Sequence, residues 1–188
     1  MSTLTLSQNA PTNTTLTDPR GTIMYEITLP KVSTPHKFGG GTTTIKRNGQ
    51  TLAAVKWGVF GSGELTMNGM TASLSDVFPK AGMLSNSRVF TTAGGEKLKW
   101  KDKSKLCCVS DDTGEPLATY NRKRFAAIRG TKSTLDISYN GTRLTDILVV
   151  TWVIAEKKAQ DRRKAGGGDG GDGGDGGGGG DGGGGGGC

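Results

Sequence analysis

The chain has 188 residues, 33 of them glycine, and a formal net charge of +7 at pH 7. Residues 166–188 contain only Gly, Asp and Cys188, so we expect one domain over residues 1–165 and a disordered Gly/Asp-rich tail after it. All 24 Lys and Arg precede residue 166, and this basic balance favours polyanionic partners. The first residues do not resemble a secretory signal and three Cys suggest no disulfide framework, which predicts an intracellular, cytoplasmic protein.

Short β-prone segments separated by turn residues occupy the first 140 residues. Residues 4–6 and 23–29 alternate apolar and polar side chains, which predicts half-buried strands. Asn48-Gly49, Asn68-Gly69 and Gly94-Gly95 each separate two such segments and favour tight hairpins, because Asn and Gly tolerate positive φ. Ten to twelve mainly antiparallel strands are therefore expected, in a sandwich or a barrel, with no helix before residue 144. The last of these strands are expected at residues 106–110, 117–120, 125–128 and 135–139.

Residues 144–155, LTDILVVTWVIA, form the longest apolar run of the chain. Their many β-branched side chains disfavour a helix. A strand that is apolar on both faces, however, needs a covering layer on each side, and the chain offers no helices to supply them. We therefore predict one C-terminal helix over residues 144–164, buried on all sides along its apolar part. The apolar run would be roughly 18 Å long as a helix, too short to span a bilayer core of about 30 Å.

Two segments, SRVFTTAGGEKLKWK (87–101) and DILVVTWVIAEKKAQDRRK (146–164), carry a resemblance to a known family. Over residues 3–164 the chain resembles the fungal (basidiomycete) domain of unknown function 6593 family. That family is similar to the tubby C-terminal-like and LURP-one-related superfamily. The resemblance implies a closed antiparallel β-barrel of about twelve strands around one buried C-terminal helix. Superfamily members include phosphoinositide binders and phospholipid scramblases, which implies lipid contact by distant analogy.

No catalytic constellation is visible in the sequence. The single histidine, His36, lies in a Pro-containing loop without a partner for acid–base chemistry. Cys107 and Cys108 fall in an expected strand, where alternation sends them to opposite faces and prevents them from clamping one metal ion. One is expected in the core and the other at or near the surface. We therefore expect a protein that is not an enzyme and has no catalytic residues, metal ligands or cofactor.

Basic side chains form two clusters that are candidates for binding anionic lipid. In the first, alternation with Leu98 and Trp100 places the lysines on the outer face of a strand, and a second cluster follows residue 121. Each basic residue near a membrane contributes about 1 kcal/mol. The alternative is a solvated face that protects a sheet edge. Aromatic residues do not interleave outward with the lysines, so nucleic acid is not indicated as a partner. The six candidate residues are Lys97, Lys99, Lys101, Arg122, Lys123 and Arg124.

The function that these observations favour is a non-enzymatic binding module that contacts anionic phospholipid or phosphoinositide through a basic barrel face. Such a protein would be peripheral at membranes, with no transmembrane segment, and Cys188 at the end of the tail is a candidate for lipidation. A protein-interaction or structural domain with a flexible tail remains the alternative.

Overall fold

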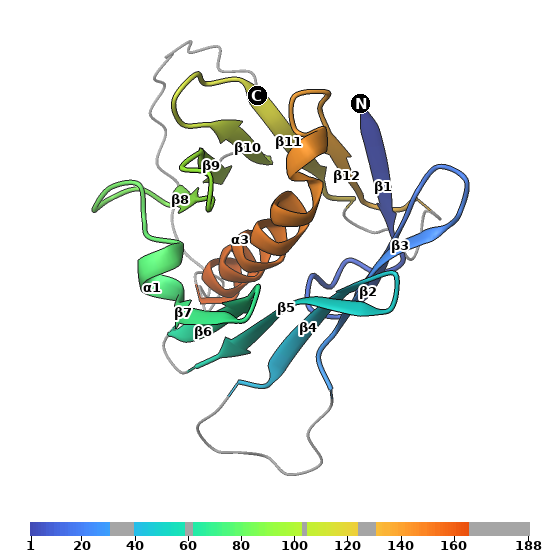
Figure 1. Cartoon of the computed structure of the whole chain (residues 1–188), viewed down its shortest axis with the longest axis horizontal. Helices are drawn as coiled ribbons and strands as arrows, with labels where there is room; N and C mark the ends of the chain where they lie inside the picture. The colour runs from blue at the N-terminus through green and yellow to red at the C-terminus, as the bar shows by residue number, and fades with distance from the viewer. Residues whose placement is uncertain (31–39, 59–61, 103–104, 124–130, 166–188) are drawn as a thin grey trace, which may run out of the picture.

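The computed structural model describes residues 1–30, 40–58, 62–102, 105–123 and 131–165. Within them the chain forms twelve strands and a long C-terminal helix, which lies inside the curve of the sheet (Figure 1). The expected strand over residues 125–128 lies outside the described residues. The strands are β1 (Ser2–Leu6), β2 (Thr14–Thr17), β3 (Ile23–Thr28), β4 (Thr42–Arg47), β5 (Gln50–Trp57), β6 (Gly63–Met67), β7 (Met70–Ser73), β8 (Arg88–Thr91), β9 (Lys97–Asp102), β10 (Leu106–Ser110), β11 (Pro116–Asn121) and β12 (Thr134–Ile137). The helical elements are α1 (Leu74–Val77), η2 (Thr142–Leu144) and α3 (Thr145–Ala165).

All twelve strands belong to one antiparallel sheet with the order β7-β6-β5-β4-β3-β2-β1-β12-β11-β10-β9-β8. Strand β1 joins the two halves, because it pairs with β2 on one side and with β12 on the other. The expected hairpins are present, and Asn48-Gly49 and Asn68-Gly69 adopt positive φ at both positions. A mainly β fold of about twelve antiparallel strands is therefore confirmed.

The expected closure of the barrel is not found. Strands β7 and β8 are the two edges of the sheet, and among the described residues no ladder pairs them. Helix α1 contacts both β7 and β8 and lies at this seam. It also differs from the expectation of no helix before residue 144. Its four residues are too few for a periodic pattern, and the Ser73 hydroxyl caps it by accepting from Ser75 N at 3.2 Å.

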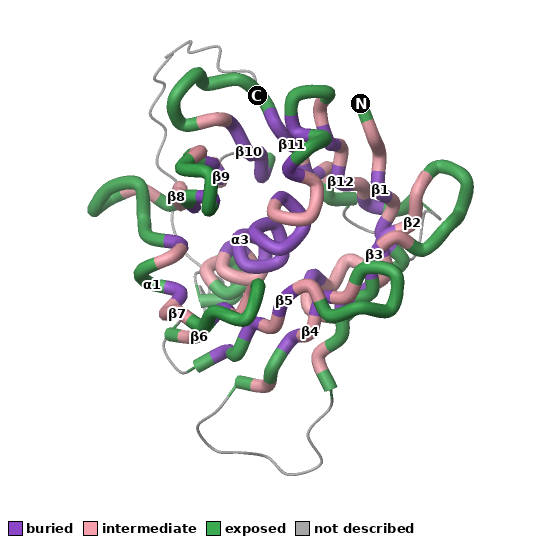
Figure 2. The backbone as a smooth tube through the Cα atoms, viewed as in Figure 1, coloured by how far each residue is buried: buried purple, intermediate pink, exposed green. Residues whose placement is uncertain are grey.

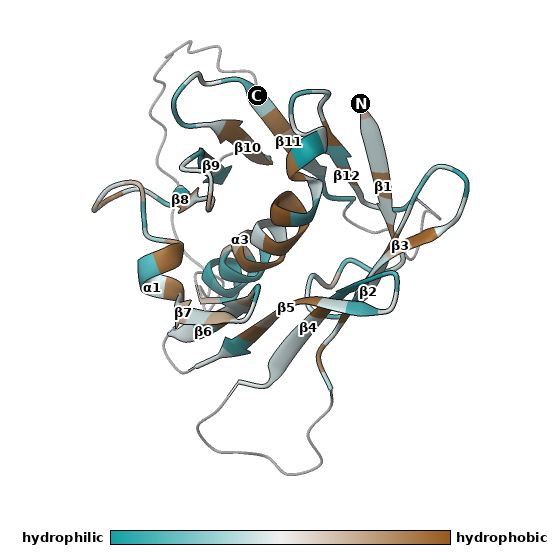
Figure 3. Cartoon of the chain, in the orientation of Figure 1, coloured by the Kyte–Doolittle hydropathy of each residue, from teal (hydrophilic) through white to brown (hydrophobic). Residues whose placement is uncertain are grey.

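Helix α3 confirms the prediction made from the apolar run. Every residue from Leu148 to Glu156 is buried, and Figure 2 shows this part of the helix enclosed by the sheet. Hydropathy changes along the helix, from apolar in its first half to polar in its second (Figure 3). Burial on all sides supplies the stabilisation that outweighs the poor helix propensity of the β-branched residues. No helix in the described part of the chain has the length and hydropathy needed to cross a membrane.

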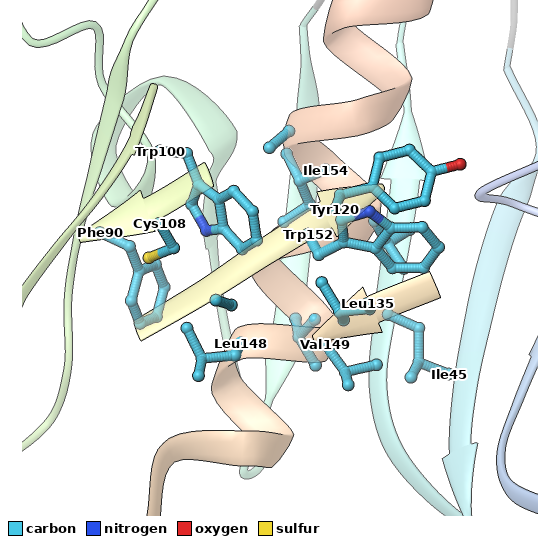
Figure 4. Close-up of a cluster of buried hydrophobic side chains, with 14 of the residues drawn as sticks. Ile45, Phe90, Trp100, Cys108, Tyr120, Leu135, Leu148, Val149, Trp152 and Ile154 are labelled. Atoms are coloured by element: carbon cyan, nitrogen blue, oxygen red, sulfur yellow. The ribbon is translucent and has the colours of Figure 1, made fainter. Parts of the chain in front are cut away.

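Polar contacts fix how α3 sits in the sheet. At its start, Asp146 accepts hydrogen bonds from the Tyr25 hydroxyl at 2.5 Å and from Arg47 Nη1 at 2.8 Å, which connects the helix to β3 and β4. In the core, Trp100 Nε1 donates to Thr151 Oγ1 at 2.9 Å. The rings of Tyr120 and Trp152 pack 5.2 Å apart, centroid to centroid, in the apolar cluster of Figure 4. These contacts place the basic C-terminal half of α3 at one end of the sheet.

Candidate functional site

The three predicted lysines of β9 lie on the outer face of the sheet, as alternation required, because Leu98 and Trp100 are buried inside it. Their charges are not equally available. Lys97 is exposed, Lys101 is half-buried, and Lys99 forms an ion pair with Asp111 at 3.0 Å. The positive charge of the lysine face of β9 is therefore partly neutralised. None of these three lysines lines the hollow at the C-terminal end of α3 or the one at the seam between β7 and β8.

The second predicted cluster lies at a different place. Arg122 and Lys123 directly follow β11 and line a hollow of about 570 Å³ at the C-terminal end of α3. The strand register explains why Lys105 lies beside Arg122 and Lys123. Leu106 of β10 is paired with Asp102 of β9 and with Tyr120 of β11, so Lys105, just before Leu106, lies at the same end of these strands as the residues that follow Tyr120. We call this pocket the basic hollow. Its charged lining residues are Asp102, Lys105, Arg122, Lys123, Glu156, Arg162 and Arg163. Arg124, Cys188 and His36 lie outside the described residues.

The positive charge of the basic hollow is only partly neutralised. Its two acidic residues are both engaged, Asp102 by Arg162 and Glu156 by Arg163, the latter at 2.8 Å. Three exposed cations remain, and their side chains have no hydrogen-bond or ion-pair partner among the described residues. These three cations are Lys105, Arg122 and Lys123.

The backbone of Lys123 is held in place by residues far away in the sequence. Asn9 Nδ2 donates to the Lys123 carbonyl at 2.7 Å, and Lys123 N donates to Ser133 Oγ at 2.8 Å. Asn9 also accepts from the Ser133 hydroxyl at 2.5 Å, and its carbonyl accepts from Gln160 of α3 at 3.4 Å. Asn9 and Ser133 therefore position the rim of the basic hollow relative to α3.

A further group of cations continues this positive region along α3. Burial, together with the nearby cations Arg88 and Arg162, lowers the pKa of Lys158 to about 8. Burial and Arg162 also lower the pKa of Arg88. Burial is the main cause of both shifts, and the smaller contribution from neighbouring cations reflects the like charges gathered here.

Glu156 is the buried acidic residue of the basic hollow. Burial raises the pKa of this carboxyl, while Arg163 and the hydrogen bond from Gln160 oppose the shift. The charged form is therefore disfavoured in the folded protein. Glu156 therefore makes the free energy of unfolding depend on pH. The contribution of this carboxyl to stability is fully present below its ordinary pKa and is lost as the pH rises through its folded-state pKa.

Glu156→Gln is expected to raise the free energy of unfolding at pH 7 by about 1 kcal/mol or less, because it keeps the hydrogen bond without a buried charge. Urea unfolding of both proteins across pH would show the gain disappear below roughly pH 4, where the wild-type carboxyl is neutral. Glu26→Gln, at an exposed strand position, is the matched control and should change little. A Glu156→Gln variant less stable than wild type at pH 7 would mean that the Arg163 ion pair outweighs the cost of burial.

A second, apolar hollow of about 480 Å³ lies at the seam between the two sheet edges. Residues of β6, β7, α1 and β8 line it together with Ile147 near the start of α3. Its rim carries Asp76 and few other polar groups. Among its apolar lining residues are Leu65, Met67, Met70, Val77, Val89 and Phe90.

The described residues contain no group of three or more His, Cys, Asp or Glu that could hold a metal ion. The expectation of one cysteine at or near the surface is wrong, because Cys107 and Cys108 are both buried. Burial raises the pKa of the Cys108 thiol, which disfavours the reactive thiolate.

Arg122 and Lys123 were predicted as site residues from the sequence, but their meeting with Lys105, Arg162 and Arg163 in one hollow was not. Lys105 is separated from them by the whole β10–β11 hairpin, and only the register of that hairpin brings it close to them. The emergence of the helix after the apolar run predicted the basic segment 157–164 at one mouth of the domain, and Arg162 and Arg163 of that segment line the basic hollow. Asn9 gave no signal, because its hydrogen bond spans 114 positions.

The chain was compared with protein families, with curated proteins and with solved structures, and the family comparison gave a match over most of its length. Residues 9–161 match the model of a family described as a family of unknown function, DUF6593. No curated protein matches the chain. An X-ray structure of a protein from Arabidopsis thaliana is similar, with a TM-score of 0.43 and 8% sequence identity over 79% of this chain and 88% of that one. Because the family match spans most of the chain, the protein belongs to the family of unknown function DUF6593.

Proposed function

We propose that this protein is a non-enzymatic binding module that contacts anionic phospholipid through the basic hollow at the C-terminal end of α3. The observation that carries the proposal is the convergence of Lys105, Arg122 and Lys123, which have no side-chain partner in the described part of the chain, in one hollow. Arg and Lys are the residues that bind phosphate oxygens, Arg in a bidentate fork and Lys as a point charge.

The hollow has the size of a small-ligand site, which favours a phosphorylated headgroup such as that of a phosphoinositide over diffuse surface charge. The outer lysines of β9 would add weaker, long-range attraction to the same surface. The resemblance to the tubby-like and LURP-one-related superfamily, in which lipid ligands occur, points in the same direction.

Co-sedimentation with lipid vesicles, at low and high salt, tests this function. Wild-type protein should bind vesicles containing phosphatidylserine or phosphoinositide and not neutral phosphatidylcholine, with affinity that falls as salt rises. Removing two cations by Arg122→Gln with Lys123→Gln should weaken binding about thirtyfold, at about 1 kcal/mol for each charge. Competition by soluble inositol trisphosphate separates headgroup recognition from attraction to surface charge.

The matched control is Arg20→Gln with Lys46→Gln, which removes the same charge at two positions that do not line the basic hollow. Lys46 precedes Arg47, the partner of Asp146, and Arg20 lies in the β2–β3 turn. This control should retain most of the affinity. Binding that does not depend on salt, or an equal loss in both double variants, would overturn the proposed site. Failure of the wild type to bind any anionic vesicle would overturn the function itself.

A protein-interaction domain is the second candidate, and the apolar hollow at the open seam favours it. An extended apolar segment of a partner could occupy this hollow beside β7, which pairs only with β6 among the described residues. A partner retained after charge reversal at Lys97, Lys99 and Lys101, but lost with Met70→Glu, would support this candidate. Met70 lines the hollow and is 70% exposed, so its substitution should not affect folding.

A further inference from the structure

The turn between α1 and β8 places two large apolar side chains at the most exposed point of a hairpin. Ser85 N donates to the Gly82 carbonyl at 3.1 Å, which makes Met83 and Leu84 the two central residues of a β-turn. Met83 is 92% exposed and Leu84 is 100% exposed. Central turn positions ordinarily carry Gly, Pro, Asn, Asp or Ser, as at Asn48-Gly49 and Asn68-Gly69 in this chain. Two adjacent apolar residues at such a tip indicate a surface that becomes covered.

The hairpin that carries this tip is ordered. Ala81 N donates to the Ser87 carbonyl at 2.9 Å, and Val89 N donates to the Pro79 carbonyl at 3.0 Å. An isolated bridge pairs Lys80 with Arg88 at its base, and Ser87 N donates to Ser85 Oγ at 3.0 Å. Figure 1 shows the segment projecting from the body of the sheet between α1 and β8. These hydrogen bonds and the bridge at the base therefore hold Met83 and Leu84 away from the body of the sheet.

Charge around the tip suits an anionic membrane surface. Residues 81–87, AGMLSNS, contain no charged side chain, and Lys80 and Arg88 flank them on both sides. Asn86 of the same hairpin lines the basic hollow, so the arm that returns from the tip borders the proposed phosphate site. Of these two cations Lys80 is exposed, whereas Arg88 is turned inward and donates from Nη1 to the Phe78 carbonyl at 2.9 Å. An apolar tip beside an exposed lysine and the basic hollow lets the side chains of the tip enter the apolar zone while the cations remain among the headgroups.

We propose that the hairpin Lys80–Arg88 inserts Met83 and Leu84 into the interfacial layer of an anionic membrane when the basic hollow engages a headgroup. This inference rests on the proposed function, because the charges of the hollow would bring the hairpin to the membrane. It adds an apolar, salt-insensitive contribution to binding that electrostatic attraction alone would not give.

A tryptophan reporter tests the insertion directly. The native residues Trp57, Trp100 and Trp152 are at most 9% exposed, so lipid-borne quenchers should affect them little. Leu84→Trp should show a blue-shifted emission on anionic vesicles and strong quenching when the acyl chains are brominated. Tyr139→Trp is the matched control, because Tyr139 is 85% exposed and lies beside Arg143 at the other end of α3. Its emission should not respond.

A second variant separates insertion from headgroup binding. Met83→Ser with Leu84→Ser should weaken binding to anionic vesicles at least about tenfold, because two apolar side chains no longer leave water. It should melt like the wild type and bind soluble inositol trisphosphate equally well, whereas Tyr139→Ser should leave vesicle binding unchanged. If wild type binds vesicles but the Leu84→Trp variant is not quenched and the double serine variant binds equally, the insertion is wrong and the proposed function survives. If wild type binds no anionic vesicle, both fail.

Discussion

Trp152→Asp is expected to abolish cooperative folding of the whole domain rather than loosen one edge of the sheet. Trp152 is fully buried in α3, and its ring packs against Tyr120 among side chains from several strands (Figure 4). A carboxylate there would lose a large apolar contact and gain no visible partner. The combined cost is several kcal/mol, against a total stability of roughly 5–15 kcal/mol for a domain. Val150→Asp should have the same effect, because Val150 is equally buried.

Circular dichroism melts and urea unfolding would check this expectation. Lys164→Asp is the control on the same helix, at an exposed position in the last turn, and should cost only a fraction of the stability. A Trp152→Asp or Val150→Asp variant that melts cooperatively near the parent temperature would show that α3 is not enclosed. Loss of folding would also show that the two halves of the sheet do not fold separately, because α3 contacts β5 in one half and β9 in the other.

The burial of α3 could be predicted from the sequence alone. A run that is apolar in every direction must be buried in every direction, and this constraint overrode the β-branched propensity of Val149, Val150 and Val153. Hairpins were equally accessible, since Asn-Gly pairs encode positive φ locally. Closure of the barrel was not accessible. Whether β7 and β8 pair depends on the positions of two distant edges and on α1 between them, and no local pattern reports that.

In the candidate site, too, the face that each residue occupies was predictable and the pairing of charges was not. Alternation placed Leu98 and Trp100 inside and the lysines of β9 outside, but it could not show that Asp111 neutralises Lys99. Similarly, the segment after Ala155 suggests a solvated charged helix end, and only the fold shows that Glu156 is buried against Arg163. Local periodicity predicts which face a residue occupies. Pairing of charges across strands requires the register of the whole sheet.

Gly141→Ala is expected to lower the free energy of unfolding by about 3 kcal/mol, although the change adds one methyl group. A Cβ at this position would lie 2.4 Å from the Leu117 carbonyl oxygen and 3.1 Å from side-chain atoms of both Ile137 and Leu148. These neighbours belong to β11, β12 and α3, so relief of the clash requires movement of the sheet or of the helix. The backbone is not the obstacle, because Gly141 has φ −81° and ψ −12°, which any residue can adopt.

Gly94→Ala is the matched control for this substitution, because the nearest atom to its Cβ would be Thr92 Oγ1 at an ordinary 3.7 Å. Thermal melts should show the melting temperature of Gly141→Ala lowered by roughly 6–12 °C and that of Gly94→Ala nearly unchanged. Equal stability of the two variants would mean that the β12–α3 connection has room to relax.

Because Gly141 sets where α3 enters the sheet, a stable variant with a displaced helix would also shift Arg162 and Arg163 relative to Arg122 and Lys123. Gly141→Ala should therefore weaken anionic vesicle binding even under conditions where the domain remains folded.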